Sequence, residues 1–265
     1  MLGMRIITVI VGIPLIAGLL FLGGWFWHSL FIAIAVVGLY EYLKMLENAD
    51  IKPMFVSSYL LLVGVLAGVW IGAAASFLLF VAIIVMIGIM VWRFPRYNFS
   101  DVIYNFFGAF YIAFNLSWAM RLESNQQAFA LMLLIFILTW SSDIGGYIAG
   151  RLWGQRKLAP ELSPNKTREG ALGGLVLSVL LAMIYCYCLP MLKIGPGMAA
   201  LLGLFGSVAA QLGDLFMSGI KRYCEVKDSG KIIPGHGGVL DRFDSFLLVV
   251  PTMYFFLWGQ GHIVI

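Results

Sequence analysis

Charged residues are scarce in this chain. Asp, Glu, Lys and Arg make up 11% of its 265 residues, whereas soluble domains carry about 25% charged residues. Apolar residues reach 62%, and the mean hydropathy is +0.95. This shortage of charge excludes a soluble globular fold and predicts one integral membrane body.

Cysteine is also scarce. Cys186 and Cys188 lie inside an apolar run and Cys224 lies in a polar loop, a number and spacing that suit neither a disulfide framework nor a zinc site. The net charge is +4, but the Lys and Arg residues are concentrated in two loops between apolar stretches. That distribution fits anionic lipid or phosphate-bearing ligands, so no nucleic-acid partner is expected.

A membrane-spanning helix needs about 20 mainly apolar residues. Nine stretches qualify, near residues 6–23, 27–43, 55–72, 74–92, 102–120, 128–150, 171–190, 199–219 and 242–262. The first follows Arg5 and runs into Gly23 without a small-residue cleavage site, so it is predicted to be a retained helix rather than a signal peptide. The predicted fold class is an all-α polytopic membrane protein with about nine transmembrane helices.

The basic residues are divided unequally between the two sides of these spans. Fifteen of the 17 Lys and Arg residues fall on one side, and only Arg121 and Lys193 on the other. Because Lys and Arg favour the cytoplasmic side, the N-terminus is predicted to be cytoplasmic and the C-terminus external. The expected location is the cell inner (cytoplasmic) membrane, with a site that faces the cytoplasm.

Acidic residues separate the two halves of the chain. They are nearly absent inside the first five spans, whereas Asp143 and Asp214 lie in apolar surroundings further on. The chain is therefore predicted to consist of N-terminal transmembrane helices at 1–125 and a catalytic transmembrane region at 126–265.

The eighth span carries a polar stripe toward its cytoplasmic end. Gln211, Asp214, Ser218 and Lys221 or Arg222 recur at helical spacing on one face. A carboxylate below the membrane surface is costly and is expected to have a cation as its partner. That cation is either a metal ion or a basic residue of a neighbouring helix.

The ninth span opens with two carboxylates on one helical face. Asp241, Asp244 and Ser245 stand at i, i+3 and i+4. Like charges this close repel each other unless a cation lies between them, and Mg²⁺ prefers such oxygen ligands together with substrate phosphates. The alternative is a solvated helix start whose acidic residues complement the helix dipole.

The loop at 227–238 combines cations with glycines. Lys227, Lys231 and His236 alternate with glycines, which let backbone N–H groups approach an anion. The loop is therefore predicted to cradle phosphate, although it is not a Walker A sequence. An ordinary flexible connection is the alternative.

The sixth span and the loop after it add further polar groups. Asp143, Tyr147 and Gly150 share one helical face, and Gly145, Gly146 and Gly150 would allow close contact with another helix. The loop at 163–170 supplies hydroxyls and the cations Lys166 and Arg168. These two cations could instead be ordinary positive-inside residues.

One long motif resembles a known family. The run Ser218-x-Ile220-Lys221-Arg222-x4-Lys227-Asp228-x-Gly230-x2-Ile233-Pro234-x-His236-Gly237-Gly238-Val239-x-Asp241-Arg242-Phe243-Asp244 is similar to the signature of the phosphatidate cytidylyltransferases, and Ser142-Asp143, Tyr147, Gly150-Arg151 and 163–170 also resemble that family. Two positions depart from it: Asn165, where members often carry Lys, and Gly146, where they often carry Ala. The likeness covers roughly the second half of the chain.

The resemblance implies a membrane enzyme that uses Mg²⁺, and a second cation in addition, to transfer CMP from CTP to phosphatidate, a membrane lipid. It also implies a homodimer. The metal ligands that it implies are Asp214, Asp241 and Asp244. The catalytic residues that it implies are Asp143, Lys221, Arg222, Lys227 and His236. The substrate-binding residues that it implies are Ser163, Lys166, Thr167, Ser218, Asp228, Gly237, Gly238 and Arg242.

Two other functions remain open from the residues alone. A related lipid nucleotidyltransferase or phosphotransferase with another lipid substrate would need the same phosphate-binding groups. A cation or proton transporter would also explain carboxylates inside the membrane, but it would not require the loop of Lys, Gly and His residues beside them.

Overall fold

The computed structural model describes residues 2–233, 235 and 237–263. It is 80% helical, which confirms the all-α polytopic class. The helices of the described residues are α1 (Leu2–Leu22), α2 (Gly24–Leu46), α3 (Phe55–Ile71), α4 (Ala75–Trp92), α5 (Phe99–Arg121), α6 (Ala128–Trp153), α7 (Arg168–Cys188), α8 (Pro196–Tyr223) and α9 (Leu240–Gly259). Each helix overlaps one predicted span.

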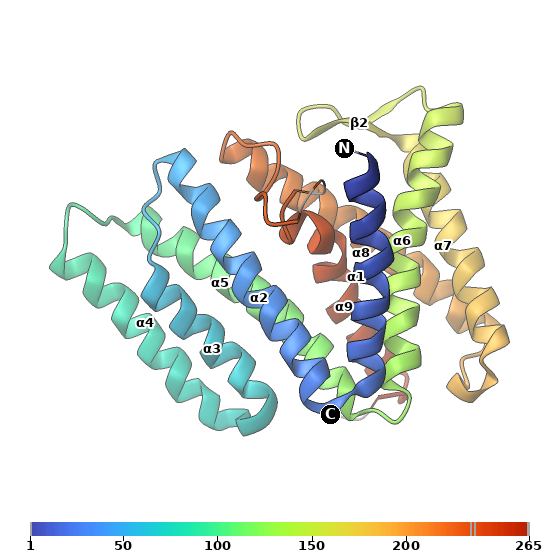
Figure 1. Cartoon of the computed structure of the whole chain (residues 1–265), viewed down its shortest axis with the longest axis horizontal. Coiled ribbons are helices and arrows are strands. Elements are labelled where there is room, and N and C mark those ends of the chain that lie inside the picture. Colours follow the sequence, from blue (N-terminus) through green and yellow to red (C-terminus); the bar gives the residue numbers. More distant parts are fainter. Residues whose placement is uncertain (1, 234, 236, 264–265) are drawn as a thin grey trace. The chain divides into compact units, whose positions relative to one another are not determined.

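Six segments of the described residues are long and apolar enough to cross a membrane. One of them, 55–92, consists of α3 and α4, which are joined by the short 3-10 helix η2 (Gly72–Ala74). The two helices lie side by side (Figure 1). Helix α1 contributes a shorter apolar helix, Ile10–Leu22. The number of nine spans and the positions of the two termini stay predictions.

By their internal contacts the described residues form two compact units. Unit 1 comprises Met1–Arg121 and Lys221–Arg242, and unit 2 comprises Leu122–Ile220 and Phe243–Ile265. The segment 221–242 therefore groups with the N-terminal helices. The predicted division at 125/126 concerns where catalysis occurs, and it stays a prediction.

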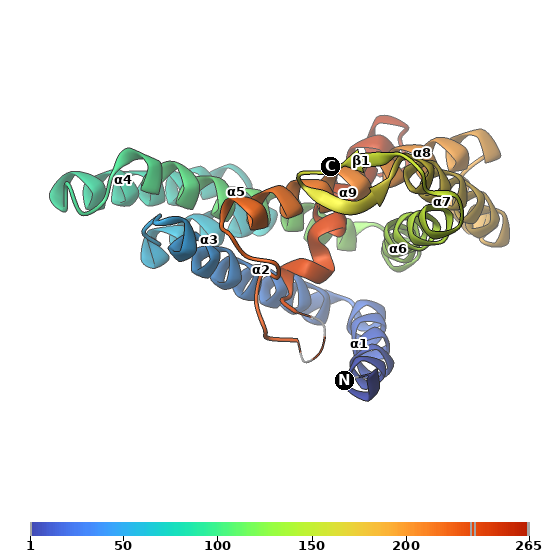
Figure 2. The same ribbon diagram turned by 90° about the horizontal axis from the view of Figure 1, so that it is seen from above.

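Unit 1 is built around helix α5. Helix α5 packs against α2 and α3, and α3 packs against α4. From above, α2 and α3 form one layer and α4 and α5 a second (Figure 2). The Trp27 indole is 1% exposed, and its Nε1 donates to the Ala119 carbonyl at 2.8 Å, which joins α2 to α5 inside the apolar core.

Unit 2 is built on a close contact between α6 and α7. A Cβ added at Gly145 would lie 2.6 Å from the Gly173 carbonyl oxygen, so only glycine permits this approach. The predicted close helix contact of the sixth span is thereby confirmed. Buried hydroxyl pairs, Ser141 with Ser178 at 2.8 Å and Ser142 with Ser207 at 2.9 Å, tie α6 to α7 and to α8.

A short β-hairpin follows α6, where the sequence predicted only a loop. Strands β1 (Lys157–Ala159) and β2 (Ser163–Thr167) pair antiparallel at the ends of α6 and α7 (Figure 1). Helix α7 begins at Arg168, earlier than the predicted 171, because the Thr167 hydroxyl accepts a hydrogen bond from the Gly170 N–H and caps the helix. The hairpin thus fixes the residues that precede α7.

Candidate active site

Unit 2 contains a pocket of about 540 Å³ between α6, the hairpin, α7 and α8. That volume lies within the range of about 300–1,000 Å³ that small-molecule sites occupy. The polar side chains that line it are Ser142, Asp143, Tyr147, Arg151, Asn165, Lys166, Thr167, Gln211 and Asp214. The structure therefore brings together Asp143, Lys166, Thr167 and Asp214, four of the residues that the sequence singled out.

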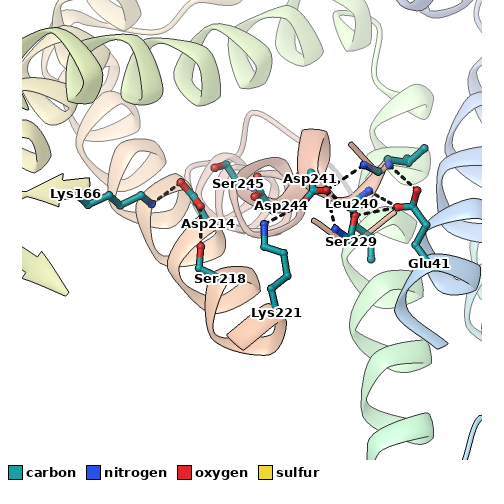
Figure 3. Close-up of polar contacts among 12 residues, drawn as sticks. Glu41, Lys166, Asp214, Ser218, Lys221, Ser229, Leu240, Asp241, Asp244 and Ser245 are labelled. Atoms are coloured by element: carbon teal, nitrogen blue, oxygen red, sulfur yellow. Dashed lines mark hydrogen bonds and ion pairs between the residues drawn. The ribbon is translucent and has the colours of Figure 1, made fainter. Parts of the chain in front are cut away.

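Asp214 forms an ion pair across this pocket. The Lys166 ammonium reaches from β2 to the Asp214 carboxylate on α8 (Figure 3). The Ser218 hydroxyl donates to the same carboxylate at 3.4 Å from one turn further along α8. The expected cation partner of Asp214 is thus present as a lysine, although it comes from a strand rather than from a neighbouring helix.

The α6 side of the pocket carries a second group of polar side chains. Asp143 and Tyr147 are exposed and line the cavity. Arg151 Nη1 donates to the Tyr147 hydroxyl at 2.8 Å. Asp143 and Tyr147 therefore lie along one face of the helix, as the spacing predicted, and the Arg151 guanidinium joins them at the pocket.

Helix α8 is placed by contacts with α7 and α9. Gln211 Nε2 donates to the Ala171 carbonyl at 3.0 Å. A Cβ at Gly213 would lie 2.6 Å from the Asp244 carbonyl oxygen, so α9 passes directly beside Gly213, the residue that precedes Asp214. The Ser245 hydroxyl, on the same stretch of α9, is buried and has no hydrogen-bond partner within the described part of the chain.

A second polar group lies in unit 1, around Asp241. Lys221 Nζ lies 2.7 Å from Asp241 Oδ1, and the two side chains are 13% and 6% exposed. The backbone N–H groups of Ser229 and Gly238 donate to the other carboxylate oxygen at 2.8 and 3.0 Å. These two N–H groups of the predicted phosphate cradle therefore hold Asp241, and cradling of phosphate by the loop stays a prediction.

The environment of Asp241 favours its charged form. Burial alone would raise its pKa, but the hydrogen bond from Lys221, together with those from Gly238 and Ser229, outweighs burial. The pKa of Asp241 is therefore held below its ordinary value. The carboxylate is ionised at neutral pH.

Glu41 is a residue that the sequence did not single out. It lies on α2, is 2% exposed, and accepts hydrogen bonds from Val239 N, Leu240 N and Ser229 Oγ at 2.9, 2.9 and 3.1 Å (Figure 3). No local signal identifies it, because its partners follow almost 200 residues later in the chain. In the sequence, Glu41 differs from its surroundings only in being an acidic residue near the end of an apolar stretch.

The remaining predicted residues have less defined surroundings. Arg222, Lys227, Asp228 and Arg242 are exposed. Ser163 lies on β2 but outside the pocket lining, and Asp244 accepts a hydrogen bond from the Ser245 N–H at 2.7 Å. Gly237 has a φ of +83°, which L side chains rarely adopt. His236, predicted to be catalytic, lies outside the described residues.

Asp214 and Asp241 have carboxylate oxygens of the kind that magnesium prefers, but each carboxylate is paired with a lysine in this structure. Among residues 2–233, 235 and 237–263, no three Asp, Glu, His or Cys side chains are grouped so that they could hold a metal. Magnesium commonly uses one or two carboxylates and completes its shell with water and substrate phosphates. Carboxylates that already hold an ammonium, as Asp214 and Asp241 do, have the charge and donor chemistry for such a site.

An apolar groove adjoins the pocket. It measures about 420 Å³, lies between α7 and α8, and shares Leu158, Ala171 and Gln211 with the polar pocket. Aliphatic side chains form most of its remaining wall, and Arg168 lies at its edge. A polar cavity and an apolar groove therefore lie next to each other within one unit.

Comparison with known proteins shows several relatives. A protein named phosphatidate cytidylyltransferase from Bacillus subtilis (strain 168) is 43% identical over 162 residues, which is 61% of this chain and 60% of that protein. Proteins of the same name from Staphylococcus haemolyticus (strain JCSC1435) and Staphylococcus aureus (strain COL) are 32% and 34% identical. Each of these two matches covers 94% of this chain and 96% of the relative.

A model of the cytidylyltransferase family matches residues 3–259. The match includes the pocket of unit 2, the Asp241 group of unit 1 and the helices that carry them. This chain belongs to the cytidylyltransferase family.

Proposed function

We propose that this chain transfers CMP from CTP to phosphatidate, giving CDP-diacylglycerol and pyrophosphate. The relatives that match nearly the whole chain carry the name of this activity. Family membership also disfavours the cation or proton transporter, because the matching family is one of nucleotidyl-transferring enzymes. Turnover is proposed to occur at the cytoplasmic face of the membrane, because the uneven distribution of Lys and Arg predicts that the polar loops lie on that side.

The pocket of unit 2 is the observation that carries this proposal. It gathers an ammonium, a guanidinium, hydroxyls and two carboxylates from α6, β2 and α8 around one cavity. Such a mixture suits a nucleoside triphosphate with a bound divalent cation. A purely structural ion pair would not need a cavity of this size beside it.

The reaction makes few covalent demands on the protein. An oxygen of the phosphatidate phosphate attacks the α-phosphorus of CTP, and the bond from that phosphorus to the oxygen bridging to the β-phosphate breaks, so pyrophosphate leaves with the electron pair. The nucleophile is already anionic, so no general base is required. The protein mainly aligns the two phosphates and neutralises charge.

The chain's own cations supply part of this neutralisation. Lys166 and Arg151 line the pocket, and each is held by a neighbour, Asp214 and Tyr147. We propose that Lys166 leaves Asp214 for the triphosphate when the nucleotide binds. Lys221, Arg222 and Lys227 are proposed to contact phosphate oxygens, and Asp143 and His236 to orient the reactants.

Magnesium is proposed to be held by Asp214 and Asp241, with Asp244 as a further ligand. When bound, it would neutralise phosphate oxygens and stabilise the departing pyrophosphate. A second cation and a homodimer remain proposals that follow from the family resemblance.

The apolar groove is proposed to hold an acyl chain of the lipid. It adjoins the polar pocket, and among the residues that the structure describes Arg168 at its edge is the one charged residue that lines it. A lipid phosphate in the pocket and a tail in the groove would match this division. The lipid would then enter sideways from the membrane.

One assay tests the proposed function directly. Purified full-length protein is mixed with phosphatidate vesicles, Mg²⁺ and each of the four nucleoside triphosphates in turn, and pyrophosphate and lipid product are measured. Product is expected with CTP, none after chelation, and product again when Mg²⁺ is restored. Activity with another phosphorylated lipid but not with phosphatidate would favour the related lipid transferase instead.

Asp214→Asn and Asp241→Asn test the metal assignment. Each keeps the side chain's size but removes its charge, so turnover per folded molecule should fall at least about a thousandfold, a barrier change of about 4 kcal/mol. Glu161→Gln, an exposed acidic residue in the hairpin turn, is the control and should behave as wild type. If either Asn variant stays within about threefold of wild type, that residue is not an essential metal ligand.

A further inference from the structure

Glu41 is a buried carboxylate with an unusual set of partners. It is 2% exposed on α2, and its three donors among the described residues are neutral: two backbone N–H groups and one hydroxyl. Burying a charge without a charged partner is expensive unless hydrogen bonds compensate. The three hydrogen bonds to Ser229, Val239 and Leu240 supply this compensation.

The two backbone donors belong to the start of α9. Helix α9 begins at Leu240, and the N–H groups of Val239 and Leu240 both donate to Glu41 at 2.9 Å. The first N–H groups of a helix have no acceptor within the helix, and a negative charge there also complements the helix dipole. Glu41 therefore caps α9 from a different part of the chain.

Two glycines of the signature motif make room for this carboxylate. A Cβ at Gly230 or at Gly238 would lie 2.5 Å from an oxygen of Glu41. Any other residue would force the carboxylate or the loop to move. The absence of a side chain at these glycines therefore permits the contact with Glu41, which is a role separate from phosphate binding.

The same segment is held on its other side by Asp241. Ser229 reaches both carboxylates, with its Oγ 3.1 Å from Glu41 Oε2 and 3.0 Å from Asp241 Oδ2. Gly238 donates its N–H to Asp241 and packs against Glu41. The direction in which Asp241 points therefore depends on the segment that Glu41 fixes.

We propose that Glu41 is a positioning residue for the reaction: it fixes Ser229 and the start of α9 so that Asp241 presents its carboxylate to the divalent cation. This inference rests on the proposed function. Groups that orient a metal ligand from behind typically contribute about 10–100-fold to metal affinity or activity. A merely structural buried charge would change stability and leave the Mg²⁺ requirement of the folded protein as it was.

Glu41→Gln in the full-length protein separates these two roles. The amide keeps the size, but it offers one oxygen and turns an NH₂ donor toward groups that are themselves donors. Glu47→Gln is the matched control, because Glu47 follows the end of the same helix and its carboxylate pairs with Lys44 at an exposed position. Two measurements are made on each: hydrogen exchange of residues 229–241 without metal, and product formation from CTP and phosphatidate against Mg²⁺ concentration.

The expected result for Glu41→Gln has two parts. Exchange at Val239 and Leu240 should be at least about tenfold faster than in wild type, and the Mg²⁺ concentration for half-maximal activity should rise about tenfold or more. Glu47→Gln should match wild type in both measurements. If Glu41→Gln does not fold, Ser229→Ala replaces it, which removes the shared hydroxyl and should shift both readouts in the same direction by less.

Three outcomes would overturn the inference or the function beneath it. Unchanged exchange in Glu41→Gln shows that Glu41 does not hold the segment. Faster exchange with an unchanged Mg²⁺ curve shows a structural role alone, which also contradicts the proposal. Wild type that makes no product from CTP and phosphatidate refutes the proposed function, while the exchange comparison still decides whether Glu41 holds the segment.

Discussion

At the scale of single residues, Asp214 and Asp241 carry the same charge in different surroundings. Asp214 is 27% exposed and opens onto a cavity, while Asp241 is 6% exposed and receives donors from a lysine and two backbone N–H groups. Asp214 can therefore exchange its lysine for another cation with little rearrangement. Asp241 is held in place, and its direction is set by the segment around it.

Lys166→Ala should weaken nucleotide handling. A charge-assisted hydrogen bond contributes about 1.5–3 kcal/mol, so the KM for CTP should rise at least about tenfold. Lys157→Ala is the control, because Lys157 is an exposed cation of the same hairpin that does not line the pocket. Equal KM values in the two variants would reduce Lys166 to an ordinary positive-inside residue.

Residues with a local pattern were predictable, and those with distant partners were not. Asp214 and Ser218 were identified because helical spacing places them on one face, and the structure joins them by a hydrogen bond. Glu41 was not identified, because the groups that donate hydrogen bonds to it follow almost 200 residues later in the chain. Lys166 was identified as a cation, but its pairing with Asp214 depends on the strand that carries it.

At the scale of elements, the contact between α6 and α7 supports the pocket. Gly145→Leu should destabilise unit 2, because its first side-chain carbon would already lie 2.6 Å from a backbone oxygen of α7. Overpacking of this kind costs about 1–3 kcal/mol. Gly146→Ala is the control, since its Cβ would meet nothing nearer than 3.6 Å. Thermal unfolding in detergent should separate the two, and equal midpoints would contradict this interpretation.

The groove between α7 and α8 offers a test of lipid placement. Val208→Trp fills the groove from α8 and should raise the KM for phosphatidate severalfold while leaving the KM for CTP unchanged, because tail and nucleotide occupy different spaces. Val176→Trp, an exposed position on α7 outside the groove, is the control. An equal effect on both substrates would argue against an acyl chain in this groove.

The hairpin of β1 and β2 could not be predicted from the sequence pattern. The strands span three and five residues, too short to show alternation of polar and apolar side chains. Their pairing is set by the ends of α6 and α7, which tertiary packing brings together. The helices, by contrast, follow long apolar stretches that the sequence displays directly.

At the scale of the whole molecule, the charge distribution predicts the topology. Because 15 of the 17 Lys and Arg residues fall on one side of the predicted spans, reporters fused within 151–170 and 220–240 should be cytoplasmic, and one after Ile265 external. Cysteine labelling from outside the cell provides an independent measurement. A cytoplasmic C-terminus would refute nine spans and leave the loops on the same side.

The cap on α9 also sets an order of events during synthesis. Glu41 leaves the ribosome 199 residues before Leu240, and at a synthesis rate of about 5–20 residues per second it waits roughly 10–40 s for that partner. During this interval α2 enters the membrane before the ribosome has synthesised Ser229, Val239 and Leu240, which donate hydrogen bonds to the Glu41 carboxylate. The site is therefore among the last parts of the nascent chain to be completed, and a transcript truncated before codon 239 yields a protein that can insert but cannot close this contact.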